Sequence, residues 1–359
     1  MQRCKALFFF LLCCAAAFAQ SAAAQSRSTP PLPGKGPVTC ASCHRSQAST
    51  QPGTQMGRAM QLPGDNPDLV AHPKMTYQRG AYTYEVVTRN GQSQYSVTDG
   101  THTLSLPILW AMGAQAQTWV VEHNGQMYES LVSYYPTLNG LYLTVGDDTL
   151  APKTIEDAIG RPLSEEDAKT CFGCHSTNAI VDHKLDLATL KPGLTCEHCH
   201  TGAMEHLESE IKGDHSNDPP SLADLSSEDI SNFCGRCHRS WELVVRAGWK
   251  GPSNVRFQPY RLANSKCFNG ADPRISCIAC HDPHEKVVRD VTYYDSKCLA
   301  CHSPALEAAA PTSPPAKTCP VAKSNCTSCH MPKVPFPGGH FVFTDHQIRI
   351  VKPNQPYPN

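Results

Sequence analysis

The sequence predicts a fold of mostly short helices and loops, with a small antiparallel β domain in its N-terminal half. Three observations lead to this expectation. The five-residue pattern Cys-x-x-Cys-His occurs seven times in the 359 residues. Six of these copies crowd between residues 171 and 330, which leaves too little chain for a conventional side-chain core. Between residues 76 and 143, apolar and polar residues alternate and are interrupted by Asn-Gly and Asp-Gly pairs, as in β-hairpins.

The composition excludes several classes of function. The chain has 31 Lys and Arg against 32 Asp and Glu, a formal net charge of −1. No basic run indicates a nucleic-acid partner, and no polybasic patch indicates an anionic membrane surface. What sets the composition apart from that of an average soluble protein is its 19 Cys, 17 His and 30 Pro.

Residues 1–24 are predicted to be a secretory signal peptide. A short basic start precedes the apolar run ALFFFLLCCAAAF, and small residues follow, with cleavage expected after Ala24 or Ala19. The apolar run is too short to span a bilayer comfortably, and the bulky residues before Cys13 and Cys14 disfavour a lipoprotein. A retained anchor is the alternative. We expect a periplasmic or secreted protein with no stable membrane insertion after cleavage, in a compartment where disulfides persist.

The spacing of the repeated pattern has a chemical meaning. Two thiols three residues apart can each form a thioether to one vinyl group of a haem, and the adjacent histidine then binds the iron as its proximal ligand. The pattern therefore predicts seven covalently attached c-type haems (heme c). The attaching cysteines, numbered here as motifs 1 to 7, are Cys40 and Cys43, Cys171 and Cys174, Cys196 and Cys199, Cys234 and Cys237, Cys277 and Cys280, Cys298 and Cys301, and Cys326 and Cys329. The proximal histidines are His44, His175, His200, His238, His281, His302 and His330.

Zinc and thiol redox chemistry are the alternatives for these cysteines. Motifs 5 and 6 together match the spacing of a zinc ribbon, and a single Cys-x-x-Cys can be a thioredoxin-like pair. Neither alternative explains a histidine after every one of the seven pairs. Export also fits, because bacterial c-type haem is attached outside the cytoplasm. We therefore expect a multihaem cytochrome c whose porphyrins form the core and lie close enough together to conduct electrons.

Five segments are predicted along the chain. Their ranges are a signal peptide (1–24), a linker with the first haem site (25–75), an antiparallel β domain (76–150), a six-haem domain (151–350) and a tail (351–359). In the β domain, we expect tight turns at residues 90–91, 99–100 and 124–125. In the six-haem domain, Ser164 and Ser226 each have an aspartate three residues later, which predicts helix starts that lead into motifs 2 and 4.

Two cysteines remain outside the motifs and the signal peptide, Cys267 and Cys319. Because an even remainder in an oxidising compartment favours pairing, we predict a disulfide between them.

The sixth ligand of each iron distinguishes an electron carrier from a catalyst. An electron carrier has two axial protein ligands, whereas a catalytic haem keeps one position open for substrate. Ten histidines remain after the seven proximal ones, so every sixth position could be filled. His206 and His284, in CHTGAMEH and CHDPH, lie too close to their own motifs to reach the far face of the same haem, so we expect each to ligate a neighbouring haem. The other candidates are His346, His340, His72, His183, His215 and Met60.

These other candidates rest on weaker arguments. His340 and His346 follow the last motif and could fold back onto earlier haems, whereas His183 and His215 could equally be surface residues. Near motif 1, Met56 and Met60 could ligate haem 1 or pack a helix, and an open haem 1 is a further alternative. His102 and His123, in the β pattern, are expected to be ordinary strand histidines, and His198 inside motif 3 is a less certain candidate, because an internal position often points to solvent.

The motif-rich segment resembles a known family. The stretches CEHCHTGAMEH, CGRCH, SCIACHDPHE, YDSKCLACH and NCTSCHMPK are similar to those of the exported multihaem cytochromes of the cytochrome c-552/4 group, which includes the tetrahaem cytochrome c-554 of ammonia oxidisers. The resemblance covers roughly residues 165–350 and does not extend to the β portion. It implies electron transfer through bis-histidine haems, and hence distal roles for His206 and His284.

The sequence leaves three functions open. The leading one is a heptahaem electron carrier that hops electrons between redox protein partners or accepts them from a quinol-linked donor. The second is a reductase or oxidase of a small nitrogen or sulfur compound with an open haem, since hydroxylamine oxidoreductase and multihaem nitrite reductase belong to the same superfamily. The chain lacks the Cys-x-x-Cys-Lys motif of typical nitrite reductases. The third is a subunit of a cytochrome filament, and the sequence does not determine the oligomeric state.

Overall fold

The computed structural model describes residues 38–303, 317–352 and 354–358. The predicted signal peptide and the Pro-rich stretches at 28–37 and 311–315 lie outside these residues. No helix within the described ranges is long and apolar enough to cross a membrane.

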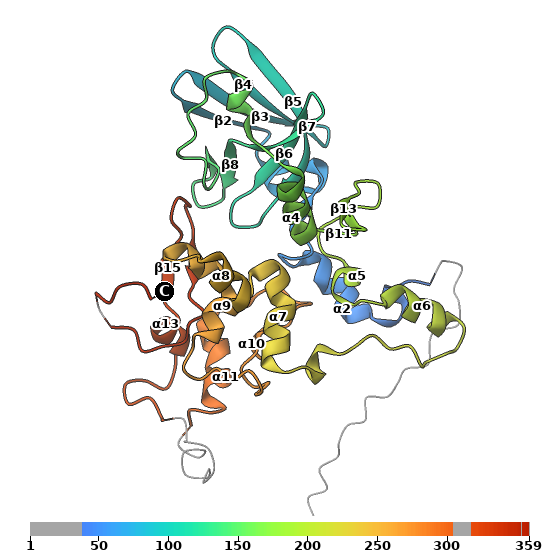
Figure 1. Cartoon of the computed structure of the whole chain (residues 1–359), viewed down its shortest axis with the longest axis vertical. Helices are drawn as coiled ribbons and strands as arrows, with labels where there is room; N and C mark the ends of the chain where they lie inside the picture. The colour runs from blue at the N-terminus through green and yellow to red at the C-terminus, as the bar shows by residue number, and fades with distance from the viewer. Residues whose placement is uncertain (1–37, 304–316, 353, 359) are drawn as a thin grey trace, which may run out of the picture. The chain divides into compact units, whose positions relative to one another are not determined.

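An eight-stranded antiparallel sheet is the largest element of the structure (Figure 1). Seven strands follow the order β10-β7-β6-β5-β4-β3-β2, and β1 pairs with the end of β5. The strands are β1 (Met60–Gln61), β2 (Lys74–Arg79), β3 (Tyr82–Arg89), β4 (Gln92–Thr98), β5 (Thr103–Met112), β6 (Thr118–His123), β7 (Gln126–Ser130) and β10 (Gly160–Pro162). A separate hairpin of β8 (Val132–Tyr135) and β9 (Gly140–Leu143) follows β7.

The tight turns of this sheet lie where the sequence predicts them. Asn90 and Gly91 join β3 to β4 with φ angles of 51° and 76°, and Asn124 and Gly125 join β6 to β7 with 52° and 77°. Such left-handed pairs match the twist of the flanking strands, and Asn and Gly adopt them at little cost. These predicted hairpins are confirmed.

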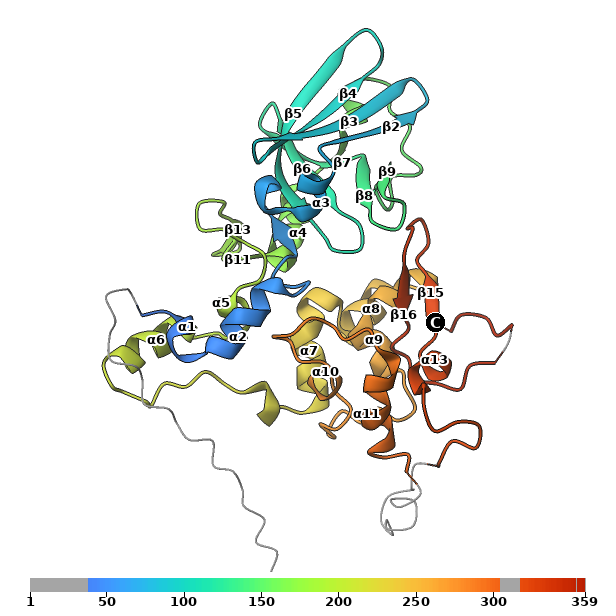
Figure 2. The same ribbon diagram turned by 180° about the vertical axis from the view of Figure 1, so that it is seen from behind.

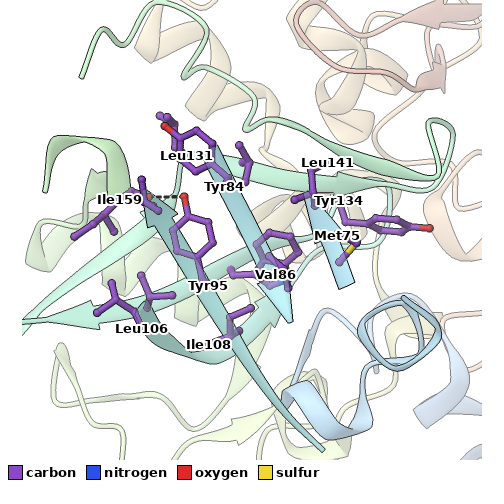
Figure 3. Packing of buried hydrophobic residues seen from close by; sticks show 14 of the residues in the cluster. Met75, Tyr84, Val86, Tyr95, Leu106, Ile108, Leu131, Tyr134, Leu141 and Ile159 are labelled. Carbon is purple, nitrogen blue, oxygen red and sulfur yellow. Dashed lines mark hydrogen bonds between the residues drawn. The ribbon is translucent and has the colours of Figure 1, made fainter. Parts of the chain in front are cut away.

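The main hydrophobic core belongs to this sheet (Figure 3). Tyr84, Tyr95 and Trp119 are all 0% exposed within it. The hydroxyl of Tyr95 donates a hydrogen bond of 2.9 Å to the carbonyl oxygen of Ile159, which secures the segment before β10. Aromatic rings thus form the centre of the β portion. The Tyr95 hydroxyl is hydrogen-bonded, whereas the Tyr84 hydroxyl and Trp119 Nε1 have no partner among the described residues.

The predicted fold class is wrong. The chain is not a haem-cored assembly of short helices with a small β domain, because a large sheet carries its main side-chain core. The sheet is larger than predicted because it includes one strand from before the alternating segment and one from after it. β1 pairs with β5, and β10 pairs with β7. Pairing between segments so far apart leaves no local pattern in the sequence.

A second apolar cluster attaches the helix α4 (Glu165–His175) to the sheet. Phe172 of α4 packs edge-on against Trp110 of β5, with ring centres 5.1 Å apart, and Met60 and Met112 lie in the same cluster. Because α4 ends at the histidine of motif 2, this packing fixes motif 2 against the sheet.

Short helices carry the motifs. Ser164 and Ser226 cap α4 and α7, each accepting a hydrogen bond of 3.1 Å from the amide of the aspartate three residues later, as predicted. The remaining helices are α1 (Cys40–Cys43), α2 (Arg45–Thr50), α3 (Pro67–Ala71), α5 (Cys196–Cys199), α6 (Ala203–Ile211), α7 (Ser227–His238), α8 (Trp241–Ala247), α9 (Gln258–Ala263), α10 (Cys277–Cys280), α11 (Asp295–Leu299) and α13 (Cys326–His330). Two-stranded sheets between them pair β11 (Ser176–Thr177) with β14 (Lys191–Pro192), β12 (Ile180–Val181) with β13 (Lys184–Leu185), and β15 (Lys333–Pro335) with β16 (Val342–Thr344).

Candidate haem-binding sites

Each motif places its two cysteines within one helical turn. The helices α1, α5, α10 and α13 begin at the first cysteine of their motifs, whereas α4 and α7 end at the motif histidine. Residues three apart lie on the same face of a helix, so both thiols of a motif point to one side. All motif cysteines are free thiols in the structure, which is the form that adds to a vinyl group.

Thiols of different motifs lie next to one another. The hydrogen bond from Cys237 lowers the pKa of the Cys174 thiol to about 7, while burial raises the pKa of Cys171 to about 11. Hydrogen-bonded thiol pairs join motifs 1 and 3, 2 and 4, 4 and 5, and 6 and 7, through Cys40–Cys196, Cys174–Cys237, Cys234–Cys277 and Cys298–Cys326. Electrostatic interactions of Cys199 with Cys234 and of Cys280 with Cys298 connect these pairs. The cysteines of the seven motifs are therefore linked through neighbouring motifs, with motif 4 next to motifs 2, 3 and 5.

A close approach of two glycines brings motifs 1 and 3 together. Gly193, with φ +72°, lies so close to Gly57 that an added Cβ would sit 2.0 Å from the Gly57 carbonyl oxygen. Gln51 Nε2 donates a hydrogen bond of 2.6 Å to the Leu194 carbonyl oxygen in the same contact. The chain before motif 3 is thus held against the chain after motif 1.

Three proximal histidines are oriented by backbone carbonyl groups. Nδ1 of His175 donates to the Ala59 oxygen at 2.9 Å, Nδ1 of His302 to the Lys317 oxygen at 2.9 Å, and Nδ1 of His330 to the Arg349 oxygen at 3.0 Å. Because a carbonyl oxygen only accepts, the proton is on Nδ1 and the lone pair of Nε2 is free for iron. Burial also lowers the pKa of His175, which favours the neutral ring that a metal requires. The donor set therefore fits haem.

Three motif histidines face a second histidine. Because an imidazole nitrogen binds a transition metal at about 2 Å, two histidines on opposite faces of one iron have ring centres roughly 6 Å apart. The pairs observed at this separation are His44 with His206 at 6.3 Å, His200 with His284 at 6.0 Å, and His281 with His346 at 6.2 Å. Both views of the ribbon show α6, which carries His206, beside α1 (Figures 1 and 2).

These pairs interleave the motifs. The second histidine of each pair comes from the segment that follows a later motif: motif 3 for His206, motif 5 for His284 and motif 7 for His346. The segment after motif 7 thus faces motif 5, the segment after motif 5 faces motif 3, and the segment after motif 3 faces motif 1. The structure places His206 and His284 beside neighbouring motifs rather than their own.

The other predicted distal ligands are placed differently. Both ring nitrogens of His72 are engaged, Nδ1 with the Asp68 carbonyl oxygen and Nε2 with Asn139 Oδ1, each at 2.8 Å. His340 packs edge-on between Tyr135 and Tyr142 of the β8–β9 hairpin. No pairing with a motif histidine is observed for either residue among the described parts of the chain.

The remaining three candidates lie at the surface or in packing. His183 is exposed in the tight turn between β12 and β13, with φ 63°. His215 donates from Nδ1 to both carboxylate oxygens of Glu210 at 2.8 Å. Met60 is 1% exposed in the cluster beside Cys171, so the structure puts it next to motif 2 and not motif 1.

The predicted disulfide is not formed in the structure, where Cys267 and Cys319 are both free thiols. Cys267 interacts electrostatically with Cys301 and Cys280, and burial raises its pKa. The surroundings of Cys319 are different. Hydrogen bonds from the backbone amides of Ala322 and Val321 lower the pKa of its thiol. The disulfide was predicted from the number of cysteines outside the motifs, and that number carries no information about the different surroundings of the two thiols.

A basic cleft lies between motifs 2 and 4. Its charged residues are Lys169, Arg236 and Arg239, and His198 from motif 3 also lines it, together with Cys174 and Cys237. No acidic side chain lines this cleft within the described residues. Such a lining suits the carboxylates of haem attached at these motifs.

Some functional groups could not be found from the sequence. The carbonyl oxygens that orient the motif histidines belong to Ala59, Lys317 and Arg349, and any residue type offers a carbonyl. Arg261 and Asp345 form an ion pair in which both side chains are 0% exposed. The signal that could have indicated it is the aspartate next to His346, although its partner lies far away in the sequence.

Paired cysteines with an anchored, neutral histidine define the attachment site of a c-type cytochrome. The family described as "Cytochrome c554 and c-prime" matches residues 149–201, which contain motifs 2 and 3. This match supports a c-type cytochrome family for the chain, with covalently bound haem c, and indicates a role in electron transfer. No curated protein and no solved structure matches the chain.

Proposed function

We propose that the chain is an exported heptahaem c-type cytochrome that transfers electrons between redox partners. The observation that carries this proposal is the set of three histidine pairs at ring separations of 6.0 to 6.3 Å, each made of a motif histidine and a histidine from a later segment. An iron with two imidazole ligands has no open position for a substrate, which suits an electron carrier.

Haem bound at these motifs supplies an iron that takes up and releases one electron reversibly. The residues of the chain determine where each iron lies and what surrounds it. The motif cysteines would anchor the group, the carbonyl oxygens of Ala59, Lys317 and Arg349 orient three motif histidines, and His206, His284 and His346 would supply second ligands to three irons. The closeness of the cysteines of neighbouring motifs would keep haems attached there near one another, as electron hopping requires.

The partners would be redox proteins or a quinol-linked donor. The formal net charge of −1 becomes more negative with every haem, since each brings two propionates. An acidic surface would favour a partner with a basic docking surface and faster association at low ionic strength. Export is supported by the predicted signal peptide and by the c-type cytochrome match.

The intact mass of the purified holoprotein tests this proposal. We expect the mass of the chain without its signal peptide plus seven haems, and a redox titration in which all the iron is reduced and reoxidised reversibly. The double variant Cys326→Ser/Cys329→Ser should have one haem fewer, because motif 7 can no longer form thioethers. A wild-type mass with fewer than seven haems, or with zinc in their place, would overturn the proposal.

A further inference from the structure

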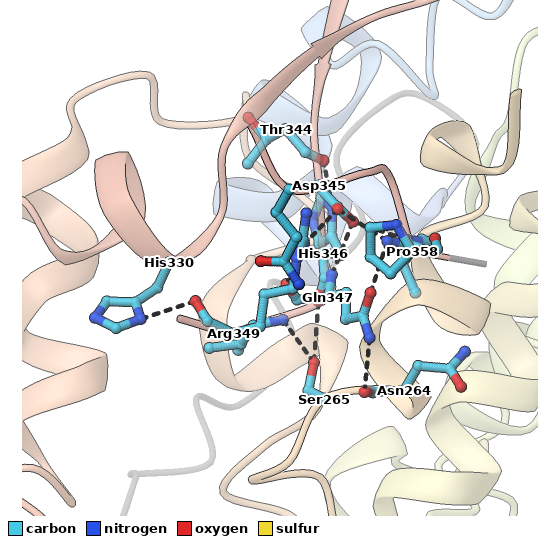
Figure 4. Close-up of polar contacts among 12 residues, drawn as sticks. Asn264, Ser265, His330, Thr344, Asp345, His346, Gln347, Arg349 and Pro358 are labelled. Atoms are coloured by element: carbon cyan, nitrogen blue, oxygen red, sulfur yellow. Dashed lines mark hydrogen bonds and ion pairs between the residues drawn. The ribbon is translucent and has the colours of Figure 1, made fainter. Parts of the chain in front are cut away.

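Residues 344–349, which we name the ligand strap, lie beside the histidines of two different motifs. Figure 4 shows the strap and its hydrogen bond with His330. His346 in the strap faces His281 of motif 5 with ring centres 6.2 Å apart. Three residues later, the carbonyl oxygen of Arg349 accepts the 3.0 Å hydrogen bond from His330 Nδ1 of motif 7. One short segment therefore acts on the ligands of two irons.

The strap is fixed by a buried ion pair. Arg261 of α9 donates from Nε to Asp345 Oδ1 at 2.8 Å and from Nη2 to Asp345 Oδ2 at 2.9 Å. The Arg261 Nη2 atom also donates to Gln347 Oε1 at 2.7 Å, and Nη1 donates to the Pro358 carbonyl oxygen at 2.8 Å. This two-pronged geometry restrains both position and rotation of the carboxylate, which a single contact would not do.

Asp345 transmits this restraint in both directions along the strap. Its Oδ2 atom also accepts a hydrogen bond of 2.6 Å from Arg349 Nη1, and its Oδ1 atom accepts one of 3.0 Å from the Gln347 amide. Asp345 is covalently next to His346, and through Arg349 it reaches the residue that orients His330. A shift of this carboxylate would move both ligands together.

A second set of contacts holds the strap to the end of α9. The Ser265 hydroxyl donates to the His346 carbonyl oxygen at 3.2 Å and accepts from the Ile348 amide at 2.8 Å. Gln347 Nε2 donates to the Asn264 carbonyl oxygen at 3.2 Å. The imidazole of His346 is also held by the strap backbone. Its Nδ1 donates to the Thr344 carbonyl oxygen at 3.0 Å, which leaves Nε2 free to bind a metal.

We propose that Arg261 is a positioning residue that sets, through Asp345, the sixth ligand of the motif 5 iron and the proximal ligand of the motif 7 iron. This inference rests on the proposed function, since it requires haem at both motifs. A buried ion pair adds little stability over apolar residues of similar size, so its value here lies in fixing one geometry. The potentials of both irons would therefore depend on Arg261, although the two irons belong to different motifs.

The test uses the full holoprotein with the substitution Arg261→Met. Electron paramagnetic resonance and a spectroelectrochemical titration are recorded for each variant. His346→Met identifies the motif 5 component by its altered signal, and Cys326→Ser/Cys329→Ser identifies the motif 7 component by its loss. We expect Arg261→Met to change the g values and midpoint potentials of these two components and to leave the other five as in the wild type.

Arg79→Met is the matched control. Arg79 donates three hydrogen bonds to carbonyl oxygens of the β portion, those of Asp147, Asp148 and Leu150, and none to the strap. It should therefore leave all components unchanged. If Arg261→Met does not mature, Arg261→Lys decides, because it keeps the charge but cannot donate to both carboxylate oxygens of Asp345, and it should shift the same two components by less.

The outcomes separate this inference from the proposed function. A variant with seven haems in which neither component moves, only one moves, or all seven move alike overturns the positioning role of Arg261. A wild-type protein that lacks haem at motif 5 or 7 overturns the proposed function itself, as its mass would show.

Discussion

Replacing His284 by methionine is expected to change the haem of motif 3 and to leave the haem of motif 5 as it is. His284 follows motif 5 closely in the sequence, but its ring lies parallel to that of His200, at 8° between planes and 6.0 Å between centres. Methionine raises the potential of a haem relative to histidine, and axial ligands span a range of about 0.8 V. We expect one component of the redox titration to rise by about 0.1 V or more.

The measurement is a redox titration combined with electron paramagnetic resonance of the oxidised holoprotein. His215→Met is the control, because His215 is exposed and bound to Glu210 rather than opposite a motif histidine. Loss of motif 3 through Cys196→Ser/Cys199→Ser identifies which component belongs to that motif. If the motif 5 component responds to His284→Met, or if none responds, the assignment of His284 to motif 3 is wrong.

The second large effect concerns the β portion and its dependence on pH. Asp147 is 3% exposed, and its Oδ2 atom has no hydrogen-bond partner among the described residues. Burial and then the nearby Glu129 raise the pKa of this carboxyl from 3.8 to about 7. In the unfolded chain the group ionises with an ordinary pKa near 3.9, so between these values the folded state holds a proton that the unfolded state has lost.

The sign follows from this difference in bound protons. The contribution of Asp147 to the free energy of unfolding is highest below about pH 4. This contribution is lost as pH rises from there through the folded pKa of about 7. The loss is on the order of 4 kcal/mol at pH 8, at 1.36 kcal/mol for each pKa unit. Asp147→Asn removes the charge, so this variant should be more stable than the wild type at pH 8 by that order and nearly equal to it at pH 4.

Denaturant unfolding followed by circular dichroism at several pH values measures this effect. The control is Glu122→Gln, at an exposed position on β6 that is not among the groups acting on Asp147, which should leave the pH dependence of the wild type unchanged. If the Asp147→Asn variant and the wild type have the same free energy of unfolding at pH 8, ionisation of the buried Asp147 carboxyl does not destabilise the fold and the prediction is wrong.

Local features of this chain were predictable, because a few neighbouring residues determine them. The tight turns at Asn90–Gly91 and Asn124–Gly125 follow from residues that tolerate positive φ. The helix starts at Ser164 and Ser226 follow from a side chain that satisfies a free backbone amide. The motifs themselves are local, since thioether attachment needs a fixed spacing of cysteines.

Features that join distant segments were not predictable. The alternating pattern reveals strands but not their partners, so the recruitment of β1 and β10 and the resulting size of the sheet were missed. The count of histidines shows that sixth ligands are available but not which iron each one faces. His72 illustrates this point, because only the fold shows that Asp68 and Asn139 engage both of its nitrogens.

A crystal structure of the holoprotein tests the central claim most directly, namely that histidines from later segments close irons held by earlier motifs. We predict one iron within each of the three pairs, with both imidazole nitrogens about 2 Å from the metal. The pairs are His44 with His206, His200 with His284, and His281 with His346. An iron at motif 1, 3 or 5 whose sixth ligand is water, or a residue other than the paired histidine, would contradict the claim.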